Sequence, residues 1–167
     1  MIPPMIRYMK PSDLPIIAQL ESELFTSASW SLSALAQELN GPDRAYYVCV
    51  GHLPSQSQLT ENTVQDEILG YAGLWYGNTD AEVMTIGVRP QCQHFGLGRL
   101  LLNQLIETAK EKQCTRVLLE VRVDNKPAKH LYKTAGFECI GIRKHYYQPE
   151  DIDALTMCLY LESVCHE

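Results

Sequence analysis

The chain has 167 residues, is 46% hydrophobic and carries a formal net charge of −6. This length suits one domain, residues 1–167, with a sizeable core. The acidic balance argues against a nucleic-acid partner, because proteins that bind nucleic acid concentrate Lys and Arg on the binding face. The first residues are too short in apolar length for a signal peptide, and no run approaches the roughly 18 apolar residues of a membrane span. We therefore expect a cytoplasmic protein with no membrane contact.

The cysteines are scattered along the chain and show no C-x-x-C pair and no Cys–His spacing of the kind that binds zinc. We expect six reduced thiols and no metal site.

The first third of the chain predicts a strand over residues 5–9, followed by two helices. Residues 11–13 supply the turn and cap of the first helix, and Ser31 caps the second. Apolar residues recur at helical spacing on each helix: Ile17, Leu20 and Leu24 on the first, and Leu32, Leu35, Ala36 and Leu39 on the second. We expect Glu21 and Glu23 to be solvated.

Two antiparallel strands are predicted next, over residues 45–50 and 68–76. The polar residues 54–62 between them indicate a hairpin tip with little to bury.

Residues 83–112 form a strand, a glycine turn and a long amphipathic helix, and this is the most informative stretch of the chain. Gly96 and Gly98 lie at the first turn of the helix, where backbone N–H groups have no partners and the helix dipole favours anions. Without Cβ atoms there, the amides can reach a phosphate or diphosphate directly, and Arg99 is placed to add a charged contact. The other interpretation is a glycine-rich turn that only joins the strand to the helix and binds no ligand.

Two common phosphate loops do not match this stretch. A Walker loop needs Gly-Lys-Ser/Thr, whereas Arg99 and Leu100 follow Gly98. A dinucleotide-binding fingerprint needs a third glycine where Leu101 stands.

The last third predicts a strand over residues 116–123, a helix and two closing strands over 138–147 and 154–161. Asn125 is the expected cap of this helix, and Gly136 is its expected end. The whole order, β-α-α-β-β-β-α-β-α-β-β, predicts an α/β fold with a mixed central sheet of about seven strands and about four helices.

The Gln-x-x-Gly-x-Gly pattern of residues 93–98 resembles the acyl-coenzyme A loop of the GCN5-related N-acetyltransferase (GNAT) family. Further matches are similar to its RimI-type protein N-terminal acetyltransferases: Trp30-Ser31, Leu119-Glu120-Val121-Arg122, Asn125, Leu131-Tyr132, Gly136-Phe137 and Tyr146-Tyr147. The resemblance covers nearly the whole chain, and only the insertion after Pro54 departs from it. It implies the GNAT acyltransferase fold and acetyl-CoA as cosubstrate.

The resemblance also implies site residues. Coenzyme contacts fall on the end of the central strand, the glycine loop and the cap of the later helix: Ile86, Gly87, Val88, His94, Phe95, Gly96, Leu97, Gly98, Arg99 and Asn125. A strand glycine such as Gly87 marks a bulge or a close approach. Asn125 is equally explained as a simple cap.

Glu120 falls on the family's general base, and Tyr132 on its proton donor or hydrogen-bond donor to the leaving sulfur. From the residues alone, Glu120 is also explained by pairing with Arg122 or a neighbouring Lys, and Tyr132 by core packing. Trp30, Tyr146 and Tyr147 are expected to line the acceptor groove, although packing explains them nearly as well.

The resemblance implies acetylation of a protein N-terminal α-amine, with an alanine of a small-subunit ribosomal protein as the expected acceptor, by direct attack in a ternary complex. Acetylation of a small-molecule amine and a non-catalytic CoA-binding module are the alternatives.

Overall fold

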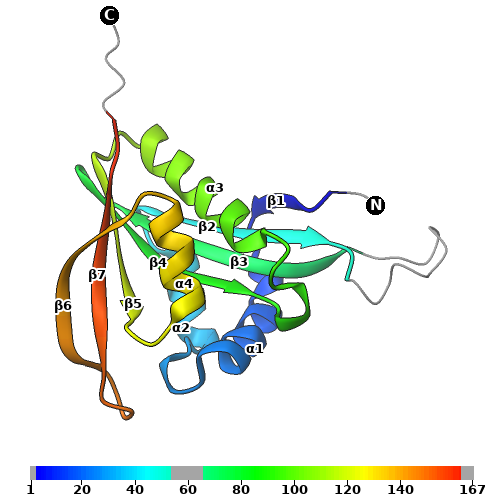
Figure 1. Cartoon of the computed structure of the whole chain (residues 1–167). Helices are drawn as coiled ribbons and strands as arrows, with labels where there is room; N and C mark the ends of the chain where they lie inside the picture. The colour runs from blue at the N-terminus through cyan, green and yellow to red at the C-terminus, as the bar shows by residue number, and fades with distance from the viewer. Residues whose placement is uncertain (1–2, 54–65, 163–167) are drawn as a thin grey trace, which may run out of the picture.

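A single mixed sheet organises the chain, with strands in the order β1-β2-β3-β4-β5-β7-β6 (Figure 1). The computed structural model describes residues 3–53 and 66–162. Its elements are β1 (Met5–Tyr8), α1 (Leu14–Phe25), α2 (Leu32–Asn40), β2 (Arg44–Gly51), β3 (Glu67–Tyr76), β4 (Asp80–Val88), α3 (Leu97–Glu111), β5 (Arg116–Arg122), α4 (Lys126–Thr134), β6 (Glu138–Tyr147) and β7 (Ile152–Tyr160). The predicted order and fold class are confirmed. Strand and helix ends lie within two residues of expectation except at the start of β4, which begins at Asp80, three residues before the expected residue 83.

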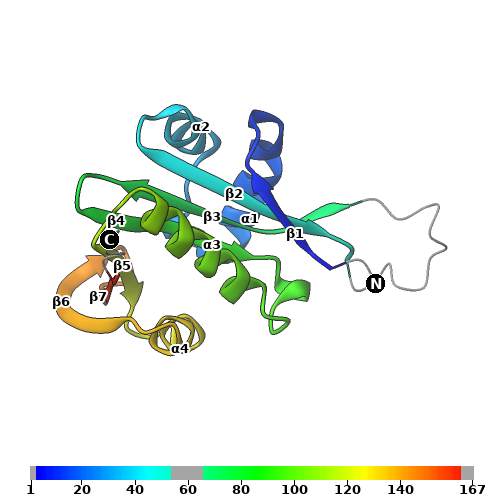
Figure 2. The same cartoon turned by 90° about the horizontal axis from the view of Figure 1, so that it is seen from above.

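The helices cover the two faces of the sheet, α1 and α2 on one and α3 and α4 on the other (Figure 2). The buried side chains form a separate cluster on each face. The larger cluster lies under α3, whose apolar stripe includes Leu101, Leu102 and Leu105. Burying each such side chain contributes about 1.5–3 kcal/mol, so both helix layers are held firmly against the sheet.

The sheet opens between β4 and β5. These two strands are the only parallel neighbours among the described strands, and they pair over just three positions, from Asp80↔Arg116 to Glu82↔Leu118. Beyond that point β4 runs on to Val88, and among the described strands it is paired there only with β3. Met84 is an extra residue opposite β3, because the register shifts between its neighbours Val83 and Thr85. A bulge of this kind bends a strand, and it lies where the opening begins. Figure 1 shows β5 turning away from β4 with α4 in front of the opening.

Two expectations about side chains are wrong. Glu21 is not solvated but has no exposed surface at all. It lies one turn after Ile17, on the stripe of α1 that packs against the sheet. Leu32, expected on the buried stripe of α2, is 48% exposed because it begins the helix at the edge of the contact. Glu23 is exposed, as expected.

The sequence predicted either a bulge or a close approach of another residue at Gly87, and the structure shows the second. The bulge is at Met84, whereas a Cβ on Gly87 would lie 2.4 Å from the Tyr71 ring on β3. Gly87 is therefore required by close approach. The predicted hairpin tip at residues 54–62 lies outside the described residues.

No helix in the described ranges is long and apolar enough to cross a membrane. Five cysteines in these ranges are free thiols, as expected, and four of them are buried. Cys165 lies outside the described residues.

Candidate active site

A cavity of about 930 Å³ occupies the opening between β4 and β5. Its wall is built by α1 and the following loop, β4, β5, α4, the end of β6 and the hairpin after it. Seven of the predicted site residues line it: Trp30, Ile86, Glu120, Asn125, Tyr132, Tyr146 and Tyr147. The structure therefore brings together residues that are up to 117 positions apart, from Trp30 to Tyr147.

Glu120 lies on β5 with both carboxylate oxygens engaged. Thr156 Oγ1, on the adjacent β7, donates to Glu120 Oε2 at 2.7 Å. Arg143 Nε, on β6, forms an ion pair with Oε1 at 3.0 Å. The Glu120 side chain is 14% exposed. The pairing that the sequence suggested with Arg122 is not made, because Arg122 instead bonds Asp124 at 3.0 Å.

Tyr132 lies on α4, with 8% of its surface exposed, and packs against the Phe137 ring. Burial raises the pKa of the Tyr132 phenol, and the neighbouring Tyr147 adds to that rise. The phenol therefore keeps its proton at neutral pH. Because an ordinary thiol has a pKa near 8.5, complete transfer of this proton to a thiolate is uphill, and Tyr132 is better suited to hydrogen-bond the sulfur.

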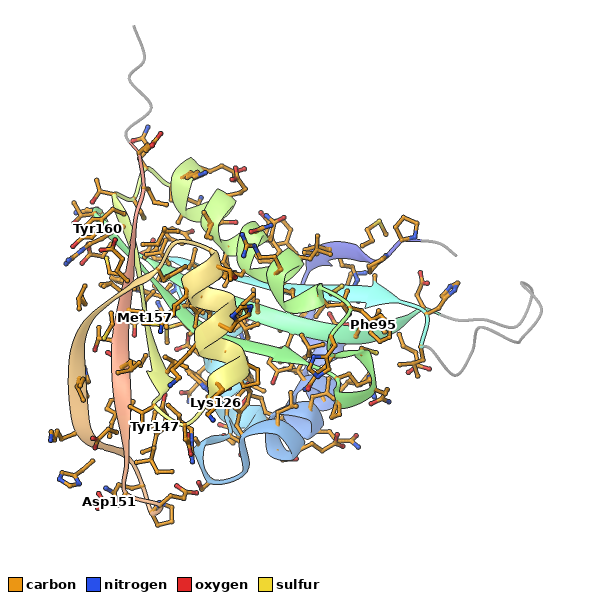
Figure 3. The ribbon with its side chains drawn as sticks, viewed as in Figure 1. Phe95, Lys126, Tyr147, Asp151, Met157 and Tyr160 are labelled. Carbon is orange, nitrogen blue, oxygen red and sulfur yellow. The ribbon has the colours of Figure 1, made fainter. Side chains whose placement is uncertain are left out.

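The three aromatic residues Trp30, Tyr146 and Tyr147 line the cavity from the loop after α1 and the end of β6, and this part of the wall is called the mouth below. Tyr146 and Tyr147 pack edge to face, with ring centroids 5.0 Å apart. Burial raises the pKa of Tyr147 to about 12. Figure 3 shows Tyr147 near the hairpin between β6 and β7, with Asp151 at its tip. In that hairpin Glu150 accepts a hydrogen bond from Ser27 of the loop after α1. Two segments far apart in the sequence are thereby joined across this mouth.

Glu21 holds the loop that carries Trp30. Tyr71 Oη and Thr85 Oγ1 donate to Glu21 Oε1 at 2.9 and 2.8 Å, and the backbone N–H of Trp30 donates to Oε2 at 3.1 Å. A buried carboxylate is tolerated only when donors satisfy it in this way. Sequence reasoning missed this residue. The available signal was its position four residues after Ile17, on the apolar stripe of α1.

The glycine loop lies outside the cavity lining, beside the other end of the opening. Gly96 has a φ of 81° and begins α3 without any side-chain cap. Apart from its two chain neighbours, no residue in the described ranges has an atom within 4 Å of the Cβ that Gly96 lacks. His94 and Phe95 are exposed, Phe95 by 70%, and Figure 3 shows Phe95 in the loop before α3. The space over this loop is open to a ligand.

The first-turn amides are available as donors. In the described residues, no backbone hydrogen bond uses the N–H of Leu97, Gly98 or Arg99, and the ladder begins with Leu100 N–H donating to Gly96 at 3.0 Å. The Arg99 guanidinium is already bonded to Thr134 at 3.1 Å, at the end of α4. Three free amides at a helix N-terminus suit a diphosphate, and the dipole adds to their attraction.

Asn125 performs the capping role that the sequence allowed, since its side-chain oxygen accepts from Ala128 N–H at 3.2 Å. It also lines the cavity. The two explanations given for Asn125 are therefore compatible in the structure.

Glu82 is a further acidic residue of the cavity that sequence reasoning missed. Glu82 is exposed as a residue, but the partial desolvation of its carboxyl group raises the pKa, as does the negative charge of Glu120, whereas Arg143 opposes the rise. In sequence, Glu82 is one of three polar residues in β4, with Asp80 and Thr85. Only the parallel pairing of β4 with β5 places it beside Glu120.

Comparison with known proteins bears on this site directly. The family model described as Acetyltransferase (GNAT) family matches residues 17–137. A Bacillus subtilis protein, provisionally named as a ribosomal protein bS18-alanine N-acetyltransferase, is 34% identical over 155 residues, which cover 91% of this chain and 92% of that protein. The N-alpha-acetyltransferase RimI of Mycobacterium tuberculosis is 38% identical over 151 residues, which cover 87% and 85%.

Solved structures agree with these relatives. The crystal structure of the ribosomal-protein-S18-alanine N-acetyltransferase from Escherichia coli superposes with a TM-score of 0.79 at 26% identity, covering 98% of this chain and 97% of that one.

Proposed function

The chain belongs to the GNAT acetyltransferase family, and from this we propose that it transfers acetyl from acetyl-CoA to the N-terminal α-amine of a protein. The acceptor that we propose is a small-subunit ribosomal protein beginning with alanine, since relatives over most of the chain carry names of that activity. The observation that carries the proposal is the cavity between β4 and β5. Glu120 on β5 and Tyr132 on α4 both line it. The proposed location is the cytoplasm, where ribosomal proteins are made.

The glycine loop and the end of β4 are the proposed coenzyme cradle. The free N–H groups of Leu97, Gly98 and Arg99 suit the diphosphate, and Gly96 leaves room for it. Ile86, Gly87 and Val88 run along the open edge of β4, where none of the described strands pairs with them on the β5 side. An extended, amide-containing arm can hydrogen-bond such an edge as another strand would. His94, Phe95 and Asn125 flank this path.

The chemistry requires a neutral amine, because the lone pair of the nitrogen must attack the thioester carbon. An α-ammonium group has a reference pKa near 8, so removing its proton at neutral pH costs little more than about 1 kcal/mol. Glu120 is the proposed general base. As the carbon–sulfur bond breaks, the Tyr132 phenol is the proposed hydrogen-bond donor to the negative sulfur.

The acceptor is proposed to enter through the mouth formed by Trp30, Tyr146 and Tyr147. Glu21 fixes the backbone of Trp30, and the contact between Ser27 and Glu150 joins the two sides. A mouth bounded by backbone and aromatic rings suits an extended peptide better than a small amine.

The test is release of free thiol from acetyl-CoA in the presence of a peptide beginning with alanine. The same peptide with a blocked N-terminus is the matched control, and a panel of polyamines and amino acids covers small acceptors. We expect turnover with the free peptide alone, and tandem mass spectrometry should place the acetyl group on its α-nitrogen. Turnover of small amines without the peptide would contradict the proposed acceptor, and binding of acetyl-CoA without any turnover would contradict catalysis.

A further inference from the structure

The Glu120 carboxylate is held from two neighbouring strands. Glu120 is paired with Thr156 across β5 and β7, and Thr156 Oγ1 donates to Glu120 Oε2 at 2.7 Å. On β6, Gly141 is paired with Thr156, and Arg143 follows Gly141 by two residues, so its side chain projects from the same face. The Nε atom of Arg143 lies 3.0 Å from Glu120 Oε1. Each carboxylate oxygen therefore has an anchor of its own.

Arg143 reaches Glu120 from outside the cavity. The described residues that line the cavity include Glu120 but not Arg143, whose side chain is 59% exposed. The guanidinium therefore holds one oxygen from the β6 side, and the cavity side of the carboxylate is left for the amine of the acceptor.

A bulge in β6 brings an aromatic ring of the mouth to the same guanidinium. Residues three apart on a regular strand project from opposite faces, as Arg143 and Tyr146 would. The pairing of β6 with β7 is irregular between Arg143 and Tyr147, and His145 in that stretch has a φ of 57°. The centroid of the Tyr146 ring lies 5.5 Å from Arg143 Cζ. The bulge thus re-aims Tyr146 so that its ring supports the cation of the ion pair.

The positive charge of Arg143 acts on two carboxylates. Glu82 on β4 lines the same cavity as Glu120. Partial desolvation and the negative charge of Glu120 raise the pKa of Glu82, and Arg143 opposes that rise. Removing the cation would strengthen the repulsion between the two carboxylates and so favour other orientations of the Glu120 side chain.

We propose that Arg143 is a positioning residue for acetyl transfer, which holds the Glu120 carboxylate in the orientation that accepts the proton of the acceptor amine. This inference rests on the proposed function and deepens it. Tyr146 keeps the guanidinium in place, so the mouth that receives the acceptor also supports the base.

The physical reason is geometric. A general base must hold its oxygen within hydrogen-bond reach of the amine while the nitrogen attacks, and a small misplacement lowers the rate steeply. An exposed ion pair contributes little to stability, so the consequence of losing Arg143 should appear in catalysis.

The test is a double-mutant cycle of Arg143→Gln and Glu120→Gln, with kcat and KM measured separately for the alanine-starting peptide and for acetyl-CoA. We expect Arg143→Gln to lower kcat about 10-fold, which is less than the loss of the base itself, with the KM for acetyl-CoA unchanged. In the Glu120→Gln background, Arg143→Gln should change kcat by less than about twofold, because no base is left to orient.

Matched variants separate this role from a general effect of charge or fold. Arg143→Lys keeps a positive charge within reach of Glu120 and should recover part of the lost kcat. Lys144→Gln removes the adjacent, exposed cation of β6, which forms no ion pair within residues 3–53 and 66–162, and should match the parent. Arg143→Gln should unfold in urea close to the parent midpoint.

An Arg143→Gln variant with the kcat of the parent overturns the proposal. The same fractional loss with and without the Glu120 carboxylate also overturns it, since a merely structural role gives additive losses. A parent that acetylates no amine ends the proposed function and this role with it, whereas an active parent with an additive cycle ends the role of Arg143 alone.

Discussion

Removal of the Glu21 carboxylate should be the most destabilising change at the acceptor side of the cavity. Glu21 has no exposed surface and accepts hydrogen bonds from Tyr71, Thr85 and Trp30. Glu21→Ala leaves all three donors without a partner. A hydrogen bond to a charged group contributes about 1.5–3 kcal/mol, and the three are not additive because they share one carboxylate. We expect the free energy of unfolding to fall by about 3–5 kcal/mol.

Glu21→Gln isolates the anchor of the Trp30 loop. The glutamine side-chain oxygen can still accept from Tyr71 and Thr85. Its NH₂ group, however, faces the Trp30 N–H, and two donors cannot form a hydrogen bond with each other. We expect a loss of about 1–3 kcal/mol in stability and a raised KM for the peptide, with the KM for acetyl-CoA unchanged. Tyr71→Phe, which removes a single donor, should cost about 1–2 kcal/mol.

Urea unfolding at neutral pH measures these losses as shifts of the midpoint at constant m value. Glu23→Gln, an exposed position on the same helix, is the control and should stay within about 0.5 kcal/mol of the parent. A Glu21→Ala variant within about 1 kcal/mol of the parent would refute the reasoning. An unchanged peptide KM in Glu21→Gln would refute the anchoring of the loop.

Four further outcomes are expected. Glu120→Gln should lower kcat for the peptide about 10²-fold or more, with the Kd for acetyl-CoA unchanged in a calorimetric titration; activity equal to the parent near neutral pH would remove Glu120 as the base. Gly98→Ala should be as stable as the parent or up to about 1 kcal/mol more so, since its new Cβ meets Leu131 at 3.4 Å and Val88 at 3.9 Å, both ordinary van der Waals contacts. The KM for acetyl-CoA should rise several-fold, and an unchanged KM would argue against diphosphate contact there. The pKa of Tyr132 is raised above 10.0, so the contribution of its neutral form to stability is complete below pH 10 and is lost as pH rises further. Tyr132→Phe should therefore flatten the fall in unfolding free energy above pH 10. An equally steep fall in the variant would contradict the assigned burial effect. Because the pKa of Glu82 is raised in the folded state, its ionised form lowers the stability of the fold above the unfolded pKa near 4.5. Glu82→Gln should therefore have a Tm at pH 7 no lower than that of the parent, and any gain in Tm should shrink toward pH 4. A lower Tm of the variant at pH 7 would contradict the direction of this pKa shift.

The fold could be predicted from local signals because each was strong. The alternation of residues in β5, the caps at Ser31 and Asn125, and the end of α4 at Gly136 each concern a few neighbouring residues. Gly136 has a φ of 101°, a conformation that favours glycine. Such patterns specify elements without knowledge of what packs against them.

The candidate site was harder, because its interactions join distant segments. The partner of Glu120 is Arg143, which comes from β6 and lies near it only because β7 brings that hairpin beside β5. Glu21 was missed because a carboxylate on an apolar stripe becomes favourable only when donors from β3 and β4 reach it. Glu82 depends on the single parallel pairing in the sheet's described strands. No short sequence window contains these relations.

The most direct test of the central claim is a crystal structure of the chain with a peptide whose α-nitrogen is joined to CoA through an acetyl bridge. The account predicts the diphosphate on the amides of residues 97–99, the arm along the free edge of β4, and the sulfur within hydrogen-bond distance of Tyr132 Oη. The bridged nitrogen should lie beside the Glu120 carboxylate. A diphosphate bound elsewhere, or a nitrogen on the side of the sheet away from Glu120, would contradict it.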